Sequence, residues 1–119
     1  MMKEILQKLE GAPGVRGALM MTHDGVVVAG ALDGGEHARV AAFLSAVMVS
    51  IEKSAETLGL VPMQRLTLNT GHGRLLLMPV GDLALAVIAD SRTDLTPALT
   101  EVAGLTRRLL RQTRIDVPV

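Results

Sequence analysis

The residue types that could do chemistry in this 119-residue chain are three histidines, a set of carboxylates and a group of arginines. His23, His37 and His72 have no partner at the i, i+4 spacing at which helical histidines bind a metal. His23 lies beside Asp24, a pair that could serve acid–base chemistry, but no neighbouring residue supplies a nucleophile or an oxyanion site. We therefore predict no catalytic residue and no metal site.

Motifs that bind phosphate are also missing from the sequence. It contains no GxxxxGK[ST] loop and no GxGxxG turn between a strand and a helix. Gly71-His72-Gly73 superficially resembles a phosphate cradle, but it joins two predicted strands and precedes no helix. We interpret it as a structural turn and predict that the protein uses no cofactor.

Four arginines lie near the end of the chain, at positions 107, 108, 111 and 114. Cations at the C-terminal end of a helix complement its dipole and usually face solvent. An acidic partner or an anionic membrane surface is the alternative, but no aromatic residue nearby supports it.

Composition excludes further classes of function. Twelve basic and twelve acidic residues cancel, whereas nucleic-acid-binding domains usually carry a basic excess. Phe43 is the single aromatic residue, which leaves no platform for stacking bases. The chain has no cysteine, and its longest apolar run, Leu83 to Ala89, is too short to cross a bilayer. We expect a cytoplasmic protein with no signal peptide, no nucleic-acid partner and no integral membrane association.

Hydrophobic spacing and turn residues predict the elements that would position these side chains. Glycine and proline end the predicted helices, for example Gly59 and Pro62 after the second one. Asp94 or Thr96 caps the last helix. The predicted helices cover residues 3–10, 36–58 and 96–112, and the predicted strands cover residues 15–22, 26–30, 63–70, 74–80 and 83–90. We predict a single domain over residues 1–119.

Strands joined by tight turns pair mainly antiparallel, so the predicted fold is α+β, with a five-stranded, mostly antiparallel sheet flanked by three helices. Residues 83–89 are apolar throughout, as in a central strand that is covered on both faces. Residues 63–70 instead alternate, with Leu66 and Leu68 on one side. The polar positions of this strand are Arg65, Thr67 and Asn69. Such alternation is typical of an edge strand, and an open edge can pair with another chain.

The long second helix is apolar nearly all the way round, which usually means that both sides are covered. One predicted face is a core stripe of Val40, Phe43, Leu44, Val47, Met48, Ile51, Ala55 and Leu58. The opposite face carries small residues in place of charges, namely Ala38, Ala41, Ala42, Ser45, Ala46 and Val49. Alanine is a good helix former and is tolerated in water, but small side chains also let a second helix approach closely. We favour a protein–protein surface here.

Two segments of the chain resemble a known family. Leu6-x-x-Leu9 followed by Pro13-Gly14-Val15-x-Gly17-Ala18, and then Asp24-Gly25-Val26-Val27-Val28-Ala29, are similar to the opening of Roadblock / dynein light chain domains. The order of elements continues the resemblance over residues 6–110. It implies a profilin/Roadblock-like fold in which neither segment is catalytic.

Roadblock / dynein light chain domains form dimers in which the second helix and the third strand meet their counterparts. The resemblance implies a homodimer with an interface at Ala38, Ala41, Ala42, Ser45, Ala46, Val49, Arg65, Thr67 and Asn69. Bacterial Mgl-type members bind a small Ras-like GTPase and modulate its nucleotide cycle without donating an arginine finger, often in cell polarity or motility. The resemblance thus implies a non-catalytic regulator in GTPase signalling; the alternative is a structural adaptor for a signalling or cytoskeletal complex.

A GTPase would bind the outer face of the long helix, for which the candidates are Ser45, Val49, Glu52, Lys53 and Glu56. The sequence leaves open how this helix is divided between self-association and partner binding. A third function, sensing of a small ligand, would need an interior pocket with convergent polar residues, and the predicted core supplies few of these.

Overall fold

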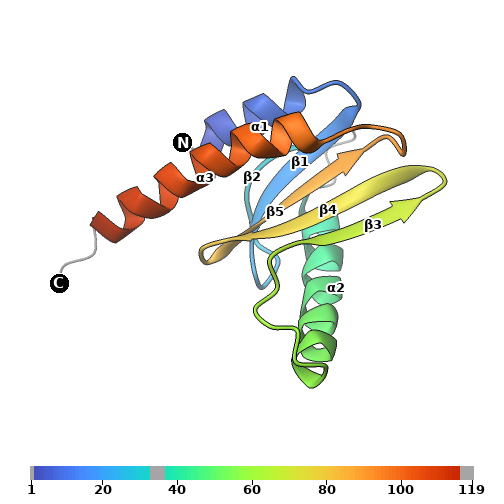
Figure 1. Ribbon diagram of the computed structural model, residues 1–119, viewed down its shortest axis with the longest axis vertical. Helices are drawn as coiled ribbons and strands as arrows, with labels where there is room; N and C mark the ends of the chain where they lie inside the picture. Colours follow the sequence, from blue (N-terminus) through green and yellow to red (C-terminus); the bar gives the residue numbers. More distant parts are fainter. Residues whose placement is uncertain (1, 33–36, 116–119) are drawn as a thin grey trace.

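The computed structural model describes residues 2–32 and 37–115, which form three helices and one five-stranded sheet (Figure 1). The helices are α1 (Met2–Glu10), α2 (His37–Thr57) and α3 (Thr96–Ile115). The strands are β1 (Val15–Thr22), β2 (Val27–Leu32), β3 (Leu66–Thr70), β4 (Gly73–Val80) and β5 (Leu83–Ala89). The predicted α-β-β-α-β-β-β-α order is confirmed. The predicted start of the second helix at Glu36 lies outside the described residues.

The strands follow the order β2-β1-β5-β4-β3, and every neighbouring pair is antiparallel. β5 lies in the middle of the sheet and is buried from Ala84 to Val87, so the predicted central strand is confirmed. β3 lies at one edge, as its alternation predicts, and β2 lies at the other. Gly81 adopts a φ of +61° in the turn that lets Val80 pair with Leu83.

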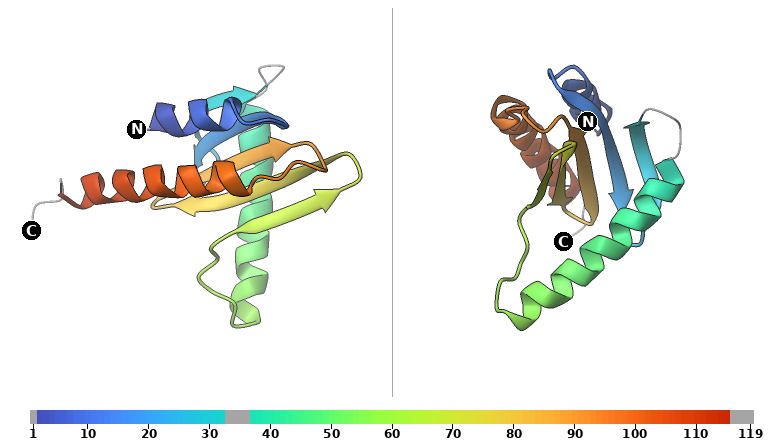
Figure 2. Two further views of the ribbon diagram at one scale, coloured as in Figure 1. Left: turned by 45° about the horizontal axis from the view of Figure 1, so that its top comes forward. Right: turned by 90° about the vertical axis from the view of Figure 1, so that its right-hand side faces the viewer.

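The three helices cover the two faces of the sheet unequally (Figure 2). α1 and α3 lie on one face and α2 on the other. Because side chains alternate along a strand, Ala18 and Met20 of β1 join the core under α1, whereas Leu19 and Met21 join the core under α2. Each face of the sheet therefore has its own apolar core.

β3 is shorter than predicted, because residues 63–65 precede the strand. Leu66 pairs with Leu77 of β4, so a longer β3 would run beside Pro79. Proline has no N–H to donate to a neighbouring strand. The predicted strand over residues 63–70 was therefore wrong in its first three residues.

The end of α2 and the start of α3 lie close to where the sequence predicts them, whereas α3 extends to Ile115, three residues beyond its predicted end. Gly59 ends α2 with a φ of +73°, and the N–H of Leu60 donates to the carbonyl of Ala55 at 2.7 Å. Asp94 caps α3, since its carboxylate accepts a hydrogen bond from the N–H of Thr96 at 3.0 Å. That hydrogen bond lowers the pKa of Asp94 below its usual value.

The predicted core stripe of α2 is confirmed at Leu44 and Met48, but it was wrong at Phe43 and Leu58, which are exposed. The residues of α2 that are buried are Ala41, Leu44, Ser45 and Met48, whereas Phe43 is exposed. The cause is a close approach between α2 and the β1–β2 turn: a Cβ atom added to Gly25 would lie 3.2 Å from the Cβ of Ser45 and 3.3 Å from the Cα of Ala42. The small residues of α2 thus accommodate the chain's own turn, which places Ala41 and Ser45 toward the sheet and Phe43 toward solvent.

Replacing Gly25 by alanine is expected to destabilise the protein. The residue has a φ of +90°, and the added Cβ would press against α2. We expect the free energy of unfolding, measured by urea denaturation, to fall by about 1–3 kcal/mol. Gly71→Ala is the matched control, because a Cβ at this turn glycine meets nothing within 4 Å. If the two variants are equally stable, the turn does not constrain α2.

Candidate interaction surface

An apolar groove lies between α2 and the β3–β4 half of the sheet, with a volume of about 330 Å³. Phe43 and Leu68 stand on its two sides and are 66% and 54% exposed. The groove remains open because α2 packs on β1 and β2 and diverges from the sheet beyond them (Figure 2). Its lining comprises Val40, Phe43, Leu44, Leu68, Thr70, His72, Gly73, Arg74, Leu75 and Ile88.

The open edge of β3 lies directly beside this groove. β3 pairs with β4 on one side, and in the described part of the chain no strand pairs with its other side. Residues 67–70 are exposed. The outward N–H and C=O groups of such an edge can pair with a strand of another chain. We refer to the groove and this edge together as the α2–β3 surface.

A second flank of α2 points away from the groove. At 100° per residue, Val49 lies about 120° around the helix from Phe43. Lys53 and Glu56 are exposed and Glu52 is half-buried, and all three lie on the same side of the helix as Val49. The candidate partner-binding residues therefore share one flank of α2, apart from Ser45.

The C-terminal half of α2 projects beyond the sheet (Figures 1 and 2). Three apolar residues just after the last residue of α2 are exposed, namely Leu58, Leu60 and Val61. The projecting end therefore adds apolar surface that the described part of the chain leaves uncovered.

The structure distributes the predicted interface residues over different surroundings. Ala38, Ala42, Ala46 and Val49 are exposed on α2, and Thr67 and Asn69 are exposed on β3, with Arg65 just before that strand. Ala41 and Ser45 are buried beneath the turn, so their predicted place on the outer face is corrected. The hydroxyl of Ser45 donates to the carbonyl of His23 at 2.7 Å, which ties α2 to the β1–β2 turn.

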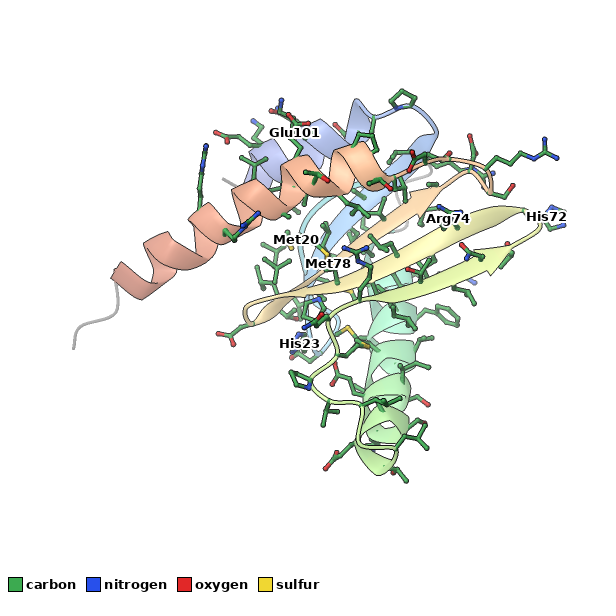
Figure 3. The ribbon with its side chains drawn as sticks, viewed as in Figure 1. Met20, His23, His72, Arg74, Met78 and Glu101 are labelled. Atoms are coloured by element: carbon green, nitrogen blue, oxygen red, sulfur yellow. The ribbon has the colours of Figure 1, made fainter. Side chains whose placement is uncertain are left out.

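The histidines and carboxylates considered for chemistry do not form a common site. His23 and His72 lie in turns at opposite ends of the sheet (Figure 3). Among residues 2–32 and 37–115, no group of three His, Cys, Asp or Glu side chains could hold a metal ion. None of the described helices is long and apolar enough to cross a membrane.

Shifted pKa values occur away from the α2–β3 surface. The hydroxyl of Thr22 donates to Asp24 and lowers the pKa of that carboxyl. Glu101 hydrogen-bonds to Lys8 at 2.9 Å and raises the pKa of that ammonium. The Lys8–Glu101 pair lines a larger groove of about 760 Å³ between α1 and α3, on the other face of the sheet; Glu101 is labelled on α3 in Figure 3.

Phe43 is the interface candidate that sequence reasoning missed. Two faces of α2 are apolar at helical spacing, one with Phe43 and one with Ala41 and Ser45. Periodicity therefore could not show which face packs on the sheet. The signal that could have separated them is Gly25, because a turn glycine packed on a helix requires small residues beneath it.

Comparison with known proteins identifies the family. The sequence model of the Roadblock/LC7 domain matches residues 1–89. The chain belongs to the Roadblock/LC7 family. The uncharacterised protein MJ0714 of Methanocaldococcus jannaschii is 29% identical over 96 residues, which is 80% of this chain and 81% of the relative. The resemblance inferred from the PGVxGA and DGVVVA segments is thereby confirmed.

Solved structures of this family share the fold at low sequence identity. A Roadblock/LC7 domain from Streptomyces avermitilis superposes with a TM-score of 0.80 at 18% identity, covering 93% of this chain and 96% of that one. MglB of Myxococcus xanthus superposes with a TM-score of 0.78 at 15% identity, covering 93% and 95% of the two chains. These superpositions confirm the fold, and membership of the Roadblock/LC7 family indicates a regulatory or adaptor role.

Replacing Ser45 by alanine is expected to lower stability by removing the hydrogen bond to the His23 carbonyl. We expect the free energy of unfolding to fall by about 1 kcal/mol, while the association state of the protein stays unchanged because Ser45 faces inward. Ser50→Ala, on the exposed side of the same helix, is the control. Urea denaturation and sedimentation velocity measure the two quantities. A change in association without a change in stability would place Ser45 in an interface after all.

Proposed function

We propose that this Roadblock/LC7 protein is a non-catalytic, dimeric regulator that binds a small Ras-like GTPase and modulates its nucleotide cycle. The observation that carries the proposal is the division of α2 into two exposed flanks. One flank borders the apolar groove and the open edge of β3, and the other carries Val49, Glu52, Lys53 and Glu56. One helix can therefore serve two interfaces at once.

The α2–β3 surface supports self-association. Its groove is apolar, and Phe43 and Leu68 expose large side chains that gain from burial at about 25 cal/mol per Å². An antiparallel pair of β3 edges in a dimer with twofold symmetry would satisfy the outward backbone groups of both copies at once. A second copy of the chain thus fits both the groove and the edge.

The second flank supports binding of a different partner. Lys53 lies between Glu52 and Glu56, so this flank offers charges of both signs around the apolar Val49. Charged groups at the rim of an interface contribute specificity more than affinity. The resemblance to Mgl-type regulators gives the class of partner, a small Ras-like GTPase.

Replacing Leu68 by arginine is expected to convert the dimer to a monomer, because the charge would enter the α2–β3 surface. We expect a dissociation constant raised at least about tenfold by sedimentation velocity, which is about 1.4 kcal/mol. Val26→Arg is the matched control, since Val26 is 58% exposed against 54% for Leu68 but lies in the turn before β2, at the other edge of the sheet. Equal association of both variants would remove the α2–β3 surface as the interface.

Capture of a GTPase tests the second flank. The purified protein is incubated with native lysate containing GDP or a non-hydrolysable GTP analogue, and captured proteins are identified by mass spectrometry. We expect a Ras-like GTPase in one nucleotide state, with its hydrolysis or exchange rate changed by the purified protein. Val49→Arg is expected to reduce capture several-fold while leaving the protein dimeric.

Two other outcomes would change the proposed function or the proposed site. Capture of one defined partner regardless of nucleotide, without a GTPase, would indicate a structural adaptor. Loss of GTPase capture only in Leu68→Arg, and not in Val49→Arg, would place the GTPase on the dimer and not on the second flank.

A further inference from the structure

Two arginines attach the β3–β4 hairpin to the rest of the molecule at the end of the sheet opposite His23. The first is Arg16, the extra residue of a β-bulge in β1: Val15 pairs with Ala89 of β5, and Gly17 pairs with the next residue, Ile88. A bulge redirects side chains, so that two consecutive residues can point to the same face of the sheet. Val15 packs against the core under α1, and the side chain of Arg16 extends along the end of the sheet.

The guanidinium of Arg16 passes the end of β5 to reach the β3–β4 turn. Its Nε donates to Oδ1 of Asp90 at 2.7 Å, and its Nη2 donates to the carbonyl oxygen of His72 at 2.9 Å. The turn passes close to both partners, since a Cβ at Gly73 would lie 3.2 Å from the carbonyl oxygen of Ala89 and 3.4 Å from Nη1 of Arg16. Asp90 is itself fixed, because its N–H donates to the carbonyl of Gly14 at 2.8 Å. Arg16 thus links β1, β5 and the turn that leads out of β3.

Arg74 makes a second link, to β3 itself (Figure 3). Its Nε donates to Oδ1 of Asn69 at 2.8 Å, and its Nη1 donates to the carbonyl of Thr93 at 2.9 Å. Asn69 is the residue of β3 that pairs with Arg74 across the ladder, and Thr93 belongs to the loop between β5 and α3. The side chain of Asn69 is therefore engaged within its own chain.

β3 has few other attachments to the body of the protein. It has no buried residue, and among the described strands it pairs with β4 alone. A short edge strand held by one neighbour frays, and fraying must be reversed before the edge can pair with a second strand. The two arginines act at the turn end of β3, where they attach the hairpin to β1, to the end of β5 and to the loop before α3.

We propose that Arg16 and Arg74 are positioning residues of the α2–β3 surface, which hold β3 so that its open edge is presented in one register to a second copy of this chain. The inference rests on the self-association that we propose for this surface. Neither arginine needs to touch the second copy. Both act through His72 and Asn69, which bracket the end of β3.

The chemistry of this link requires guanidinium and not merely positive charge. The Arg16–Asp90 pair is more than half exposed, so its charge attraction is weak and is screened by salt. What a lysine cannot reproduce is the fork geometry, in which two nitrogens donate to two acceptors, one just after β5 and one in the β3–β4 turn. Arg16→Lys is therefore expected to behave like Arg16→Ala at the hairpin, even though it keeps the charge beside Asp90.

The test compares Arg16→Ala, Arg16→Lys and Arg74→Ala with Arg92→Ala in the full chain. Arg92 is exposed and lies at the same end of the molecule. Its side chain makes no hydrogen bond or ion pair with the described residues. Amide hydrogen exchange rates measured by NMR report fraying between β3 and β4. The exchange rates of the amides between β1 and β2 serve as the reference in the same sample. Sedimentation velocity over a dilution series measures the dissociation constant of the dimer.

We expect the first three variants to exchange about tenfold faster between β3 and β4 only, and to dimerise about tenfold more weakly. Arg92→Ala should change neither quantity. Unchanged exchange between β3 and β4 would overturn the inference, and so would faster exchange with an unchanged dissociation constant. If the unmodified protein stays a monomer at every concentration, the proposed dimer fails instead, and the exchange rates alone support or overturn the fixing of β3.

Discussion

The contact between the β1–β2 turn and α2 determines which residues of the long helix reach solvent. Gly25 approaches α2 so closely that only small side chains fit beneath it. Once Ala41 and Ser45 occupy that position, the 3.6-residue repeat of the helix places Phe43 outside, and the hydroxyl of Ser45 fixes the same rotation through the carbonyl of His23. The surface on which the proposed function depends is thus a consequence of packing inside the chain.

The uneven cover of the sheet follows from the same contact. Because α2 is anchored at the β1–β2 turn, it lies over the β2 side of the sheet and leaves the β3 side open (Figure 2). The α1 and α3 layer on the other face is attached separately through its own apolar core, and the Lys8–Glu101 pair links the two helices to each other. One face of the sheet is therefore covered and the other is covered only in part, so a second chain can pack on the uncovered β3 side.

The strands and turns could be predicted from the sequence because their signals are local. Glycines at turns, Asp94 before the last helix and the apolar run of β5 each determine structure within a few residues. The family could be recognised for a related reason, since the matching segments are short and two of their glycines, Gly14 and Gly25, adopt the positive φ of turns.

The rotation of α2 and the arginine links could not be predicted, because both depend on residues far apart in the sequence. A helix that is apolar nearly all round has no periodicity that selects its inner face, so the choice comes from Gly25, a residue outside the helix. Arg16 and His72 are 56 residues apart, and a one-residue bulge between two strands leaves no mark in the hydrophobic pattern. The start of β3 at Leu66, three residues later than predicted, also depends on a distant residue, because Pro79 belongs to the neighbouring strand β4.

The projecting end of α2 affects the behaviour of concentrated solutions. Leu58, Leu60 and Val61 remain exposed there, beyond the sheet. The chain has a formal net charge of zero and a pI near 6.8, so little electrostatic repulsion separates the molecules close to neutral pH. Apolar tips that meet under these conditions adhere without any specific geometry. Colloidal stability is therefore lowest near pH 6.8 and improves as the pH moves away from this value in either direction.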